Sequence, residues 1–193
     1  MKVIVFDTEG NGYKDEQICQ LSYLIIESGE ITGKNFYFCV DSMNSHAQDV
    51  HGLSKYALHE MSSGHRFKDD CEEILRDFES ADLVVGHHVT SDISRMKKEL
   101  ARLEKSLKLK KTFCTMRYFN NALHLTSRTG QRKFPRLDEL CKYYSVSPDY
   151  VRLSCGCVYA TEDVSEHDAR YDAMATYLVM AAASRSGDVR GVF

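Results

Sequence analysis

The stretch MKVIVFDTEGNG, residues 1–12, decides the fold that the sequence predicts. Its first half, Met1–Phe6, is continuously apolar and rich in β-branched residues, which is typical of a strand buried on both faces. Asp7 and Glu9 follow at the end of that strand, before the turn Gly10-Asn11-Gly12. Residues two apart on a strand point to the same face, so both carboxylates should project together from one sheet edge. Taken alone, a D-x-E at a strand end is more often only a polar turn.

The sequence after this strand predicts an α/β fold with a mixed sheet. Two strand-like runs, Ile18–Glu27 and Ile31–Val40, are separated by Ser28-Gly29-Glu30, a hairpin signal, so the first three strands should form an antiparallel meander. Helical periodicity and short apolar runs then alternate along the chain. The later predicted elements are helices at Leu53–Met61, Phe67–Glu79, Ser91–Leu107, Leu137–Tyr144 and His167–Ser184, and strands at Asp82–Gly86 and Thr112–Thr115.

Length and composition predict one folded domain over residues 1–186, followed by a loose C-terminal tail at 187–193. Residues 125–134 and 147–165 show no clear pattern. No apolar run is long enough to span a bilayer and no signal peptide is recognisable, which predicts a cytoplasmic protein without a membrane partner. The seven cysteines are an odd number and are expected to be reduced. The net charge of −3 argues mildly against a polyanionic partner, unless clustered acids bind divalent cations.

Two more acids occupy positions where a site could form. Asp92 follows the strand at Asp82–Gly86 and falls in the first turn of a helix, where the helix dipole favours an acid without any function. Asp172 lies on the last helix, and Ser165-Glu166-His167-Asp168 resembles a capping box with Ser165 as N-cap. That start would put His167 and Asp172 roughly 140° apart around the helix, on different faces. Considered alone, His167 is more often simply an exposed residue of the first turn.

The order of these motifs resembles the DEDDh group of the DnaQ-like 3′→5′ exonucleases, which share the ribonuclease H-like fold. FDTEGNG, VVGHHVTSD and HDARYDA are similar to the three motifs of that family, and the resemblance covers nearly the whole chain. It implies a three-layer fold in which helices flank a mixed five-stranded sheet. Three weaker similarities occur in the expected order, at His51–Ser54 (HGLS), at Phe113–Met116 (FCTM) and at Pro135–Leu140 (PRLDEL).

The resemblance also implies a two-metal hydrolytic site. Asp7, Glu9 and Asp172 would hold one Mg²⁺ or Mn²⁺ ion, Asp7 and Asp92 would hold the second, and His167 would be the general base. All-oxygen ligands suit these cations. The substrate implied is the 3′ end of DNA or RNA, expected to be single-stranded, with nucleoside 5′-monophosphates as products. A polymerase or repair partner would then be a separate protein.

Further residues are candidates for substrate binding. By the same resemblance, Gly10, Asn11 and Gly12 would lie beside the terminal nucleoside. His88 stands where the family usually has Asn, and is either a substrate contact or a polar surface residue. Arg132 and Lys133 make the loop before the predicted Leu137–Tyr144 helix basic. This charge fits either contact with a phosphate of the substrate or simple solvation of the loop.

The sequence leaves two alternatives open, one for a pair of cysteines and one for the function. Cys155 and Cys157 could suggest zinc, but they supply only two ligands and no second pair follows. The alternative function is a catalytically silent nucleic-acid-binding or protein-binding module on the same fold. Such modules usually lack a carboxylate or the histidine of the site, and none is missing here.

Overall fold

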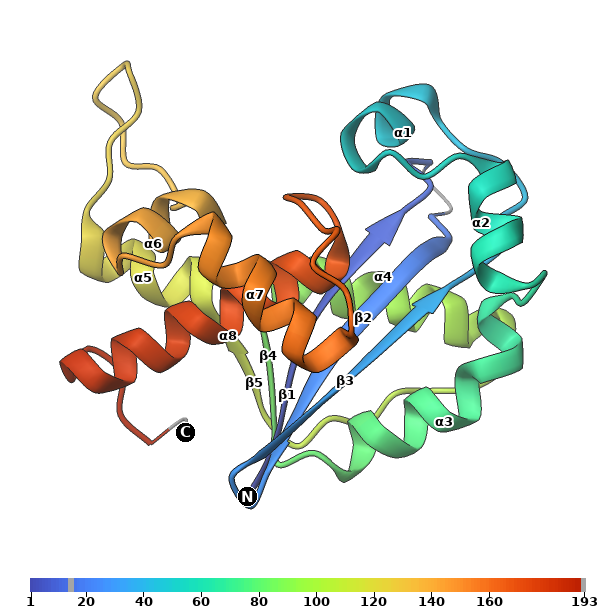
Figure 1. Ribbon diagram of the computed structural model, residues 1–193, viewed down its shortest axis with the longest axis horizontal. Coiled ribbons are helices and arrows are strands. Elements are labelled where there is room, and N and C mark those ends of the chain that lie inside the picture. Colours follow the sequence, from blue (N-terminus) through green and yellow to red (C-terminus); the bar gives the residue numbers. More distant parts are fainter. Residues whose placement is uncertain (14–15, 192–193) are drawn as a thin grey trace.

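A mixed sheet with its first strand at the centre organises the chain. The computed structural model describes residues 1–13 and 16–191. The strands are β1 (Lys2–Gly10), β2 (Ile18–Glu27), β3 (Glu30–Tyr37), β4 (Leu83–Gly86) and β5 (Thr112–Cys114). They run in the order β3-β2-β1-β4-β5, with antiparallel pairing from β1 to β3 and parallel pairing from β1 through β4 to β5 (Figure 1). The predicted meander and mixed sheet are confirmed.

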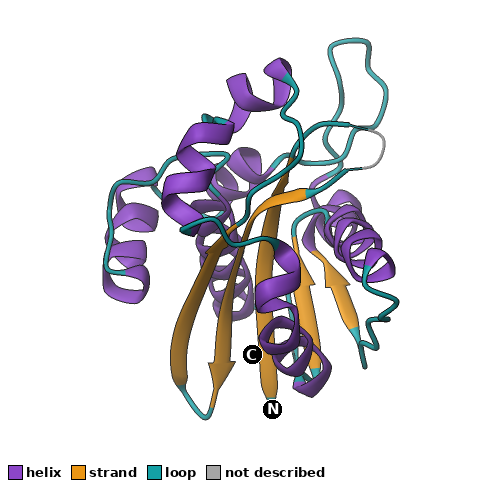
Figure 2. Cartoon of the chain, turned by 90° about the vertical axis from the view of Figure 1, so that its right-hand side faces the viewer, coloured by secondary structure: helices purple, strands orange, loops and turns teal. Residues whose placement is uncertain are grey.

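Helices cover both faces of this sheet. They are α1 (Ser45–His51), α2 (Lys55–Ser62), α3 (Phe67–Ser80), α4 (Val89–Arg102), α5 (Thr115–Leu123), α6 (Leu137–Tyr143), α7 (Pro148–Tyr159) and α8 (Ala169–Ser186). One apolar core joins the sheet to α3 and α4, and a second joins it to α5 through α8. Figure 2 shows the strands with helices packed to either side. The predicted three-layer α/β fold is therefore confirmed.

Side chains along β1 point alternately to the two faces of the sheet, and this decides which helices Asp7, Thr8 and Glu9 face. Val3 and Val5 lie in the core shared with α8, whereas Ile4 and Phe6 lie in the core shared with α3 and α4. Continuing this alternation to the end of the strand puts Asp7 and Glu9 on the α8 side. It puts Thr8, between them, on the α4 side.

Three helices were not predicted. α1 buries none of its side chains, so it carries no apolar stripe to detect. α5 begins directly after β5, which ends at Cys114, without a separating loop. α7 lies in a segment expected to lack structure. It begins at Pro148, after the N-cap Ser147, and buries only Val151 and Cys155. A stripe this sparse gives a weak periodic signal, and packing on α8 stabilises the helix instead.

The start of α8 and the C-terminal segment also differ from expectation. The N-cap of α8 is Asp168, whose side chain accepts a hydrogen bond from the backbone N–H of Arg170, so Ser165 is not the cap. The predicted loose tail is wrong for residues 187–189, where Gly187 caps α8. Val189 is buried, and Asp188 accepts hydrogen bonds from the hydroxyls of Tyr118 and Tyr144. Val192 and Phe193 lie outside the described residues.

Other expectations concern the thiols and the membrane. All seven cysteines are free thiols, in agreement with the sequence prediction. Across residues 1–13 and 16–191, none of the helices combines the length and the apolar character needed to cross a bilayer.

Candidate active site

Glu9, His167 and Asp172 meet at the C-terminal end of β1. One potential ligand atom from each residue lies within 4.8 Å of the others. Glu9 comes from β1 and Asp172 from the first turn of α8. His167 precedes the helix with a positive φ of 67°, and its backbone N–H donates to Oδ2 of Asp172 at 3.3 Å. The expected separation of His167 and Asp172 on different helix faces is therefore wrong, because His167 is not helical.

Asp92 reaches the same region from α4. The residue is only 2% exposed, and its Oδ1 accepts a hydrogen bond from the Thr8 hydroxyl at 2.7 Å. Its Oδ2 is buried without a hydrogen-bond partner among the described residues. A buried carboxylate oxygen is costly to leave unpaired, so this atom is suited to an added cation.

The clustered acids disfavour one another's ionised forms. Burial, reinforced by the charges of Asp92, Asp172 and Glu9, raises the pKa of Asp7 well above its usual value. Burial and the nearby Asp172 carboxylate raise the pKa of Glu9 to about 8. Burial likewise raises the pKa of Asp172 to about 7, against the opposing effect of the His167 backbone hydrogen bond. Hard divalent cations would favour the ionised forms, and the oxygen-rich donor set fits Mg²⁺ or Mn²⁺.

Arg95 brings a positive charge to this cluster and was not identified from the sequence. Its Nη1 donates to the carbonyl oxygen of Thr8 at 2.9 Å and lies 3.3 Å from Oδ1 of Asp92. Its Nε lies 3.0 Å from Oε1 of Glu16, an ion pair that links α4 to the segment before β2. The only sequence signal was its position three residues after Asp92 on one helix face.

The turn after β1 is held by internal contacts. The Asn11 side chain is buried, donates to the carbonyl of Ser42 at 3.1 Å and accepts from the backbone N–H of Gln17 at 3.0 Å. Any side chain at Gly10 would collide with Glu16, and Gly12 has a φ of 77°. None of the three predicted turn residues lines the cleft described next. The Asn11 side chain is thus occupied within the protein.

A cleft of about 1020 Å³ opens over the carboxylates. Its walls include all four acids, His167 and His88. Arg132 and Lys133 are not among its lining residues. Arg132 donates to the carbonyl of Asn120 at 2.7 Å, and Lys133 pairs with Glu139. The structure therefore brings His88 to the cleft but does not bring these two basic residues there.

His87 connects β4 to the far wall of the cleft and was also missed. One ring nitrogen lies 3.0 Å from the Thr115 hydroxyl oxygen, and the other lies 3.1 Å from the carbonyl oxygen of Pro135. Burial lowers the pKa of His87 to about 4, so the ring is neutral at physiological pH. A neutral ring that donates to Pro135 and accepts from Thr115 satisfies both nitrogens.

Gln20 positions the start of α8, and no sequence pattern singled it out. It lies opposite Glu9 in the β1–β2 register. Its side-chain amide donates to Oδ1 of Asp168 at 2.9 Å and accepts from the backbone N–H of Ala169 at 3.2 Å. These bonds tie the residues next to His167 to the sheet. Cys155 and Cys157, by contrast, belong to no group of potential metal ligands within the described part of the chain.

The acidic cleft lies at the end of the central strand of a mixed α/β sheet, where ligands often bind in folds of this class. The chain belongs to the exonuclease family designated RNase_T, whose family model matches residues 4–180. This assignment confirms the resemblance drawn from the three motifs. A comparison with curated protein sequences gives no match.

Solved structures show the same fold. E. coli exonuclease I in complex with a dA16 oligonucleotide matches 95% of this chain with a TM-score of 0.72 and 13% identity. Its complex with a dT13 oligonucleotide matches 97% with a TM-score of 0.72 and 15% identity. Exonuclease I from Methylocaldum szegediense matches 95% with a TM-score of 0.67 and 14% identity. The chain spans 40–42% of the length of these proteins.

Proposed function

We propose that the protein is a metal-dependent 3′→5′ exonuclease that removes nucleoside 5′-monophosphates from single-stranded nucleic acid. One observation carries the proposal: four carboxylates and His167 line one cleft at the end of β1. Asp7, Glu9 and Asp172 would hold one divalent cation, and Asp7 with Asp92 would hold a second. When bound, the two cations would neutralise the carboxylates and stabilise negative charge on the phosphate oxygens.

The protein's own groups supply the proton transfer. In the proposal, an imidazole nitrogen of His167 accepts a proton from the attacking water. The water oxygen forms a bond to phosphorus as the bond from phosphorus to O3′ breaks. The leaving O3′ takes up a proton from solvent and remains on the shortened strand as its 3′-hydroxyl, and the released nucleotide keeps its 5′-phosphate. The hydrogen bond from the His167 backbone to Asp172 supports this role because it fixes the histidine beside the acids.

The substrate is expected to enter as an unpaired strand. Two of the similar E. coli exonuclease I structures are complexes with oligonucleotides, dA16 and dT13. Of the predicted substrate contacts, His88 lines the cleft, whereas Gly10, Asn11 and Gly12 would act through the backbone of their turn. Arg132 and Lys133 would then serve only a strand that extends beyond the cleft.

Digestion of end-labelled oligonucleotides tests the proposal. Single-stranded DNA and RNA, each labelled at either the 5′ or the 3′ end, are incubated with Mg²⁺, Mn²⁺ or EDTA. We expect a 3′ label to be released at once as a mononucleotide, and a 5′ label to give a ladder of progressively shorter strands. EDTA should stop both reactions. The reverse pattern would refute the polarity, and intact strands with both metals would leave only the silent binding module.

Variants at matched acids test the assignment of the site. Asp7→Ala should abolish digestion because it removes the carboxylate that both cations would share. Asp49→Ala changes an exposed acid on α1, outside the cleft, and should digest like the wild type. Full activity in Asp7→Ala would overturn the site even if the chain is an exonuclease.

A further inference from the structure

Phe134 is an exposed aromatic side chain in the wall of the cleft. It is 51% exposed and lines the same cavity as the catalytic carboxylates. A single exposed apolar side chain is common at a protein surface, but this ring lies in the wall of the cleft that holds the carboxylates, where a bound strand would meet it. Base stacking on such rings is a common way to bind single-stranded nucleic acid.

The ring is supported by a fixed backbone. Pro135, next in the chain, is buried, and its carbonyl oxygen lies 3.1 Å from a ring nitrogen of His87. His87 directly follows β4, two residues before α4, the helix that carries Asp92. Phe134 is therefore tied to the part of the fold that positions the carboxylates, although the loop before it stands out from the molecule (Figure 1).

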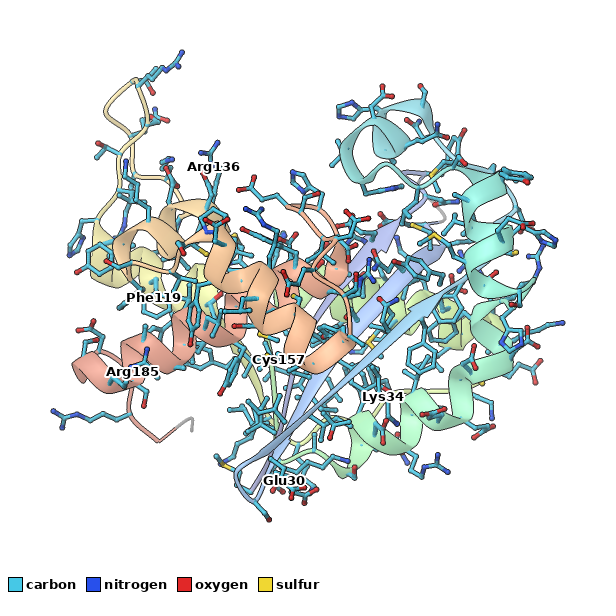
Figure 3. All side chains as sticks on the ribbon, viewed as in Figure 1. Glu30, Lys34, Phe119, Arg136, Cys157 and Arg185 are labelled. Atoms are coloured by element: carbon cyan, nitrogen blue, oxygen red, sulfur yellow. The ribbon has the colours of Figure 1, made fainter. Side chains whose placement is uncertain are left out.

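Positive charge lies on the same wall. Lys142 is exposed, lines the cleft and belongs to α6, which begins three residues after Phe134. Arg136, labelled in Figure 3, projects from the start of α6, but its guanidinium is paired with Asp138 at 2.7 Å. Lys142 is thus the better candidate for contact with a phosphate on a strand that passes Phe134.

The position of α6 indicates which nucleotide this wall would meet. Figure 1 shows α6 well separated from α1, which packs near the Gly10–Gly12 turn. Under the proposed function, that turn lies beside the terminal nucleoside. A strand that has its last phosphodiester at the carboxylates would then place an upstream nucleotide against α6.

We propose that Phe134 stacks on an unpaired base upstream of the terminal nucleotide and that Lys142 contacts the adjoining phosphate. The inference rests on the proposed function, because it assumes that a 3′ end occupies the carboxylates. With this role, the cleft wall formed by Phe134 and Lys142 would select single strands over duplexes. Paired bases are already stacked within a duplex and cannot accept the ring.

Binding without catalysis tests the stacking separately from the nuclease activity. Fluorescence anisotropy in EDTA would compare the affinities of the wild type, Phe134→Ala and Phe134→Tyr for a labelled single-stranded oligonucleotide. We expect Phe134→Ala to lower affinity about tenfold or more and Phe134→Tyr to retain it, since tyrosine also stacks. Tyr56→Ala removes a ring that is 76% exposed outside the cleft and should bind like the wild type.

An oligonucleotide with abasic upstream positions identifies the ligand of the ring. Wild type should bind it about as weakly as Phe134→Ala binds the normal strand, and Phe134→Ala should lose little more. Lys142→Gln should reduce the salt dependence of binding by about one phosphate contact. Equal affinity of wild type and Phe134→Ala for the normal strand would overturn the inference. The inference would also be overturned if Phe134→Ala lowered affinity for the abasic strand as much as it lowers affinity for the normal strand.

A mononucleotide ester separates failure of this inference from failure of the proposed function. The p-nitrophenyl ester of thymidine 5′-monophosphate has a scissile phosphodiester but no upstream base. Phe134→Ala should hydrolyse it at the wild-type rate while losing activity on single strands. If both rates fall together, the ring is merely structural. If wild type cleaves neither substrate, the proposed function fails, and the anisotropy result still decides the stacking.

Discussion

Thr8 donates its hydroxyl to Oδ1 of Asp92 across 2.7 Å, and this bond joins the central strand to the first turn of α4. The other carboxylate oxygen of Asp92 is buried and has no hydrogen-bond partner within residues 1–13 and 16–191. Thr8 lies between Asp7 and Glu9 but points to the opposite face of the sheet. One strand end thus presents acids to α8 and a supporting hydroxyl to α4.

Thr8→Val tests this support. Valine keeps the shape of the side chain but cannot donate, so Asp92 loses a hydrogen bond to its charged form. Such bonds contribute about 1.5–3 kcal/mol. We expect Mn²⁺ affinity, measured by calorimetric titration, and turnover on single-stranded DNA each to fall roughly tenfold. Thr32→Val, at an exposed position of β3, is the matched control. Unchanged Mn²⁺ affinity in Thr8→Val would show that Asp92 needs no help from Thr8.

Glu9→Gln should stabilise the metal-free protein at alkaline pH. Burial and neighbouring acids raise the pKa of Glu9 to about 8, so the folded state favours the protonated form. Its stabilising contribution is present at acidic pH and is lost as pH rises through about 8. Thermal unfolding in EDTA should therefore show the wild type melting several degrees below Glu9→Gln at pH 9, with little difference at pH 5.

Added metal should reverse that ranking. With Mg²⁺ present, the wild type should gain more thermal stability than Glu9→Gln, because the neutral amide is a poorer ligand for the cation. Glu30→Gln, in the exposed hairpin, should follow the wild type under both conditions. If Glu9→Gln melts below the wild type in EDTA at pH 9, then ionised Glu9 does not destabilise the metal-free fold, and this prediction is wrong.

The sequence predicted those parts of the site that lie on regular elements. Asp7 and Glu9 followed from strand alternation, and the meander from a hairpin signal. Arg95 and His87 could not be predicted in the same way, because their roles depend on partners distant in the sequence. His87 contacts Thr115 and Pro135, which lie 28 and 48 residues away. The cap of α8 was misassigned because Ser165 and Asp168 are both good N-cap residues.

Gln20→Leu tests how α8 is held in register with the sheet. Leucine fills a similar space but breaks the bonds to Asp168 and Ala169, and it leaves their polar groups without these partners. We expect a loss of about 1–3 kcal/mol in the free energy of unfolding, measured with urea. Turnover of the folded variant should also fall, because His167 and Asp172 flank Asp168 and Ala169, the residues that Gln20 holds against the sheet. Gln48→Leu, on the exposed surface of α1, is the control. A folded Gln20→Leu protein with full turnover would refute this positioning role.

His167→Asn separates the proposed base from a structural residue. His167 has a φ of 67°, and asparagine tolerates this left-handed conformation better than alanine does. The variant should keep the backbone bond to Asp172 while losing the imidazole. We expect turnover to fall by about 10²–10⁴-fold, the usual contribution of a general base, with Mn²⁺ affinity nearly unchanged. His124→Asn, at another positive φ outside the cleft, should remain fully active. Because His167 lies within 4.8 Å of Glu9 and Asp172, a parallel loss of Mn²⁺ affinity would instead identify it as a metal ligand.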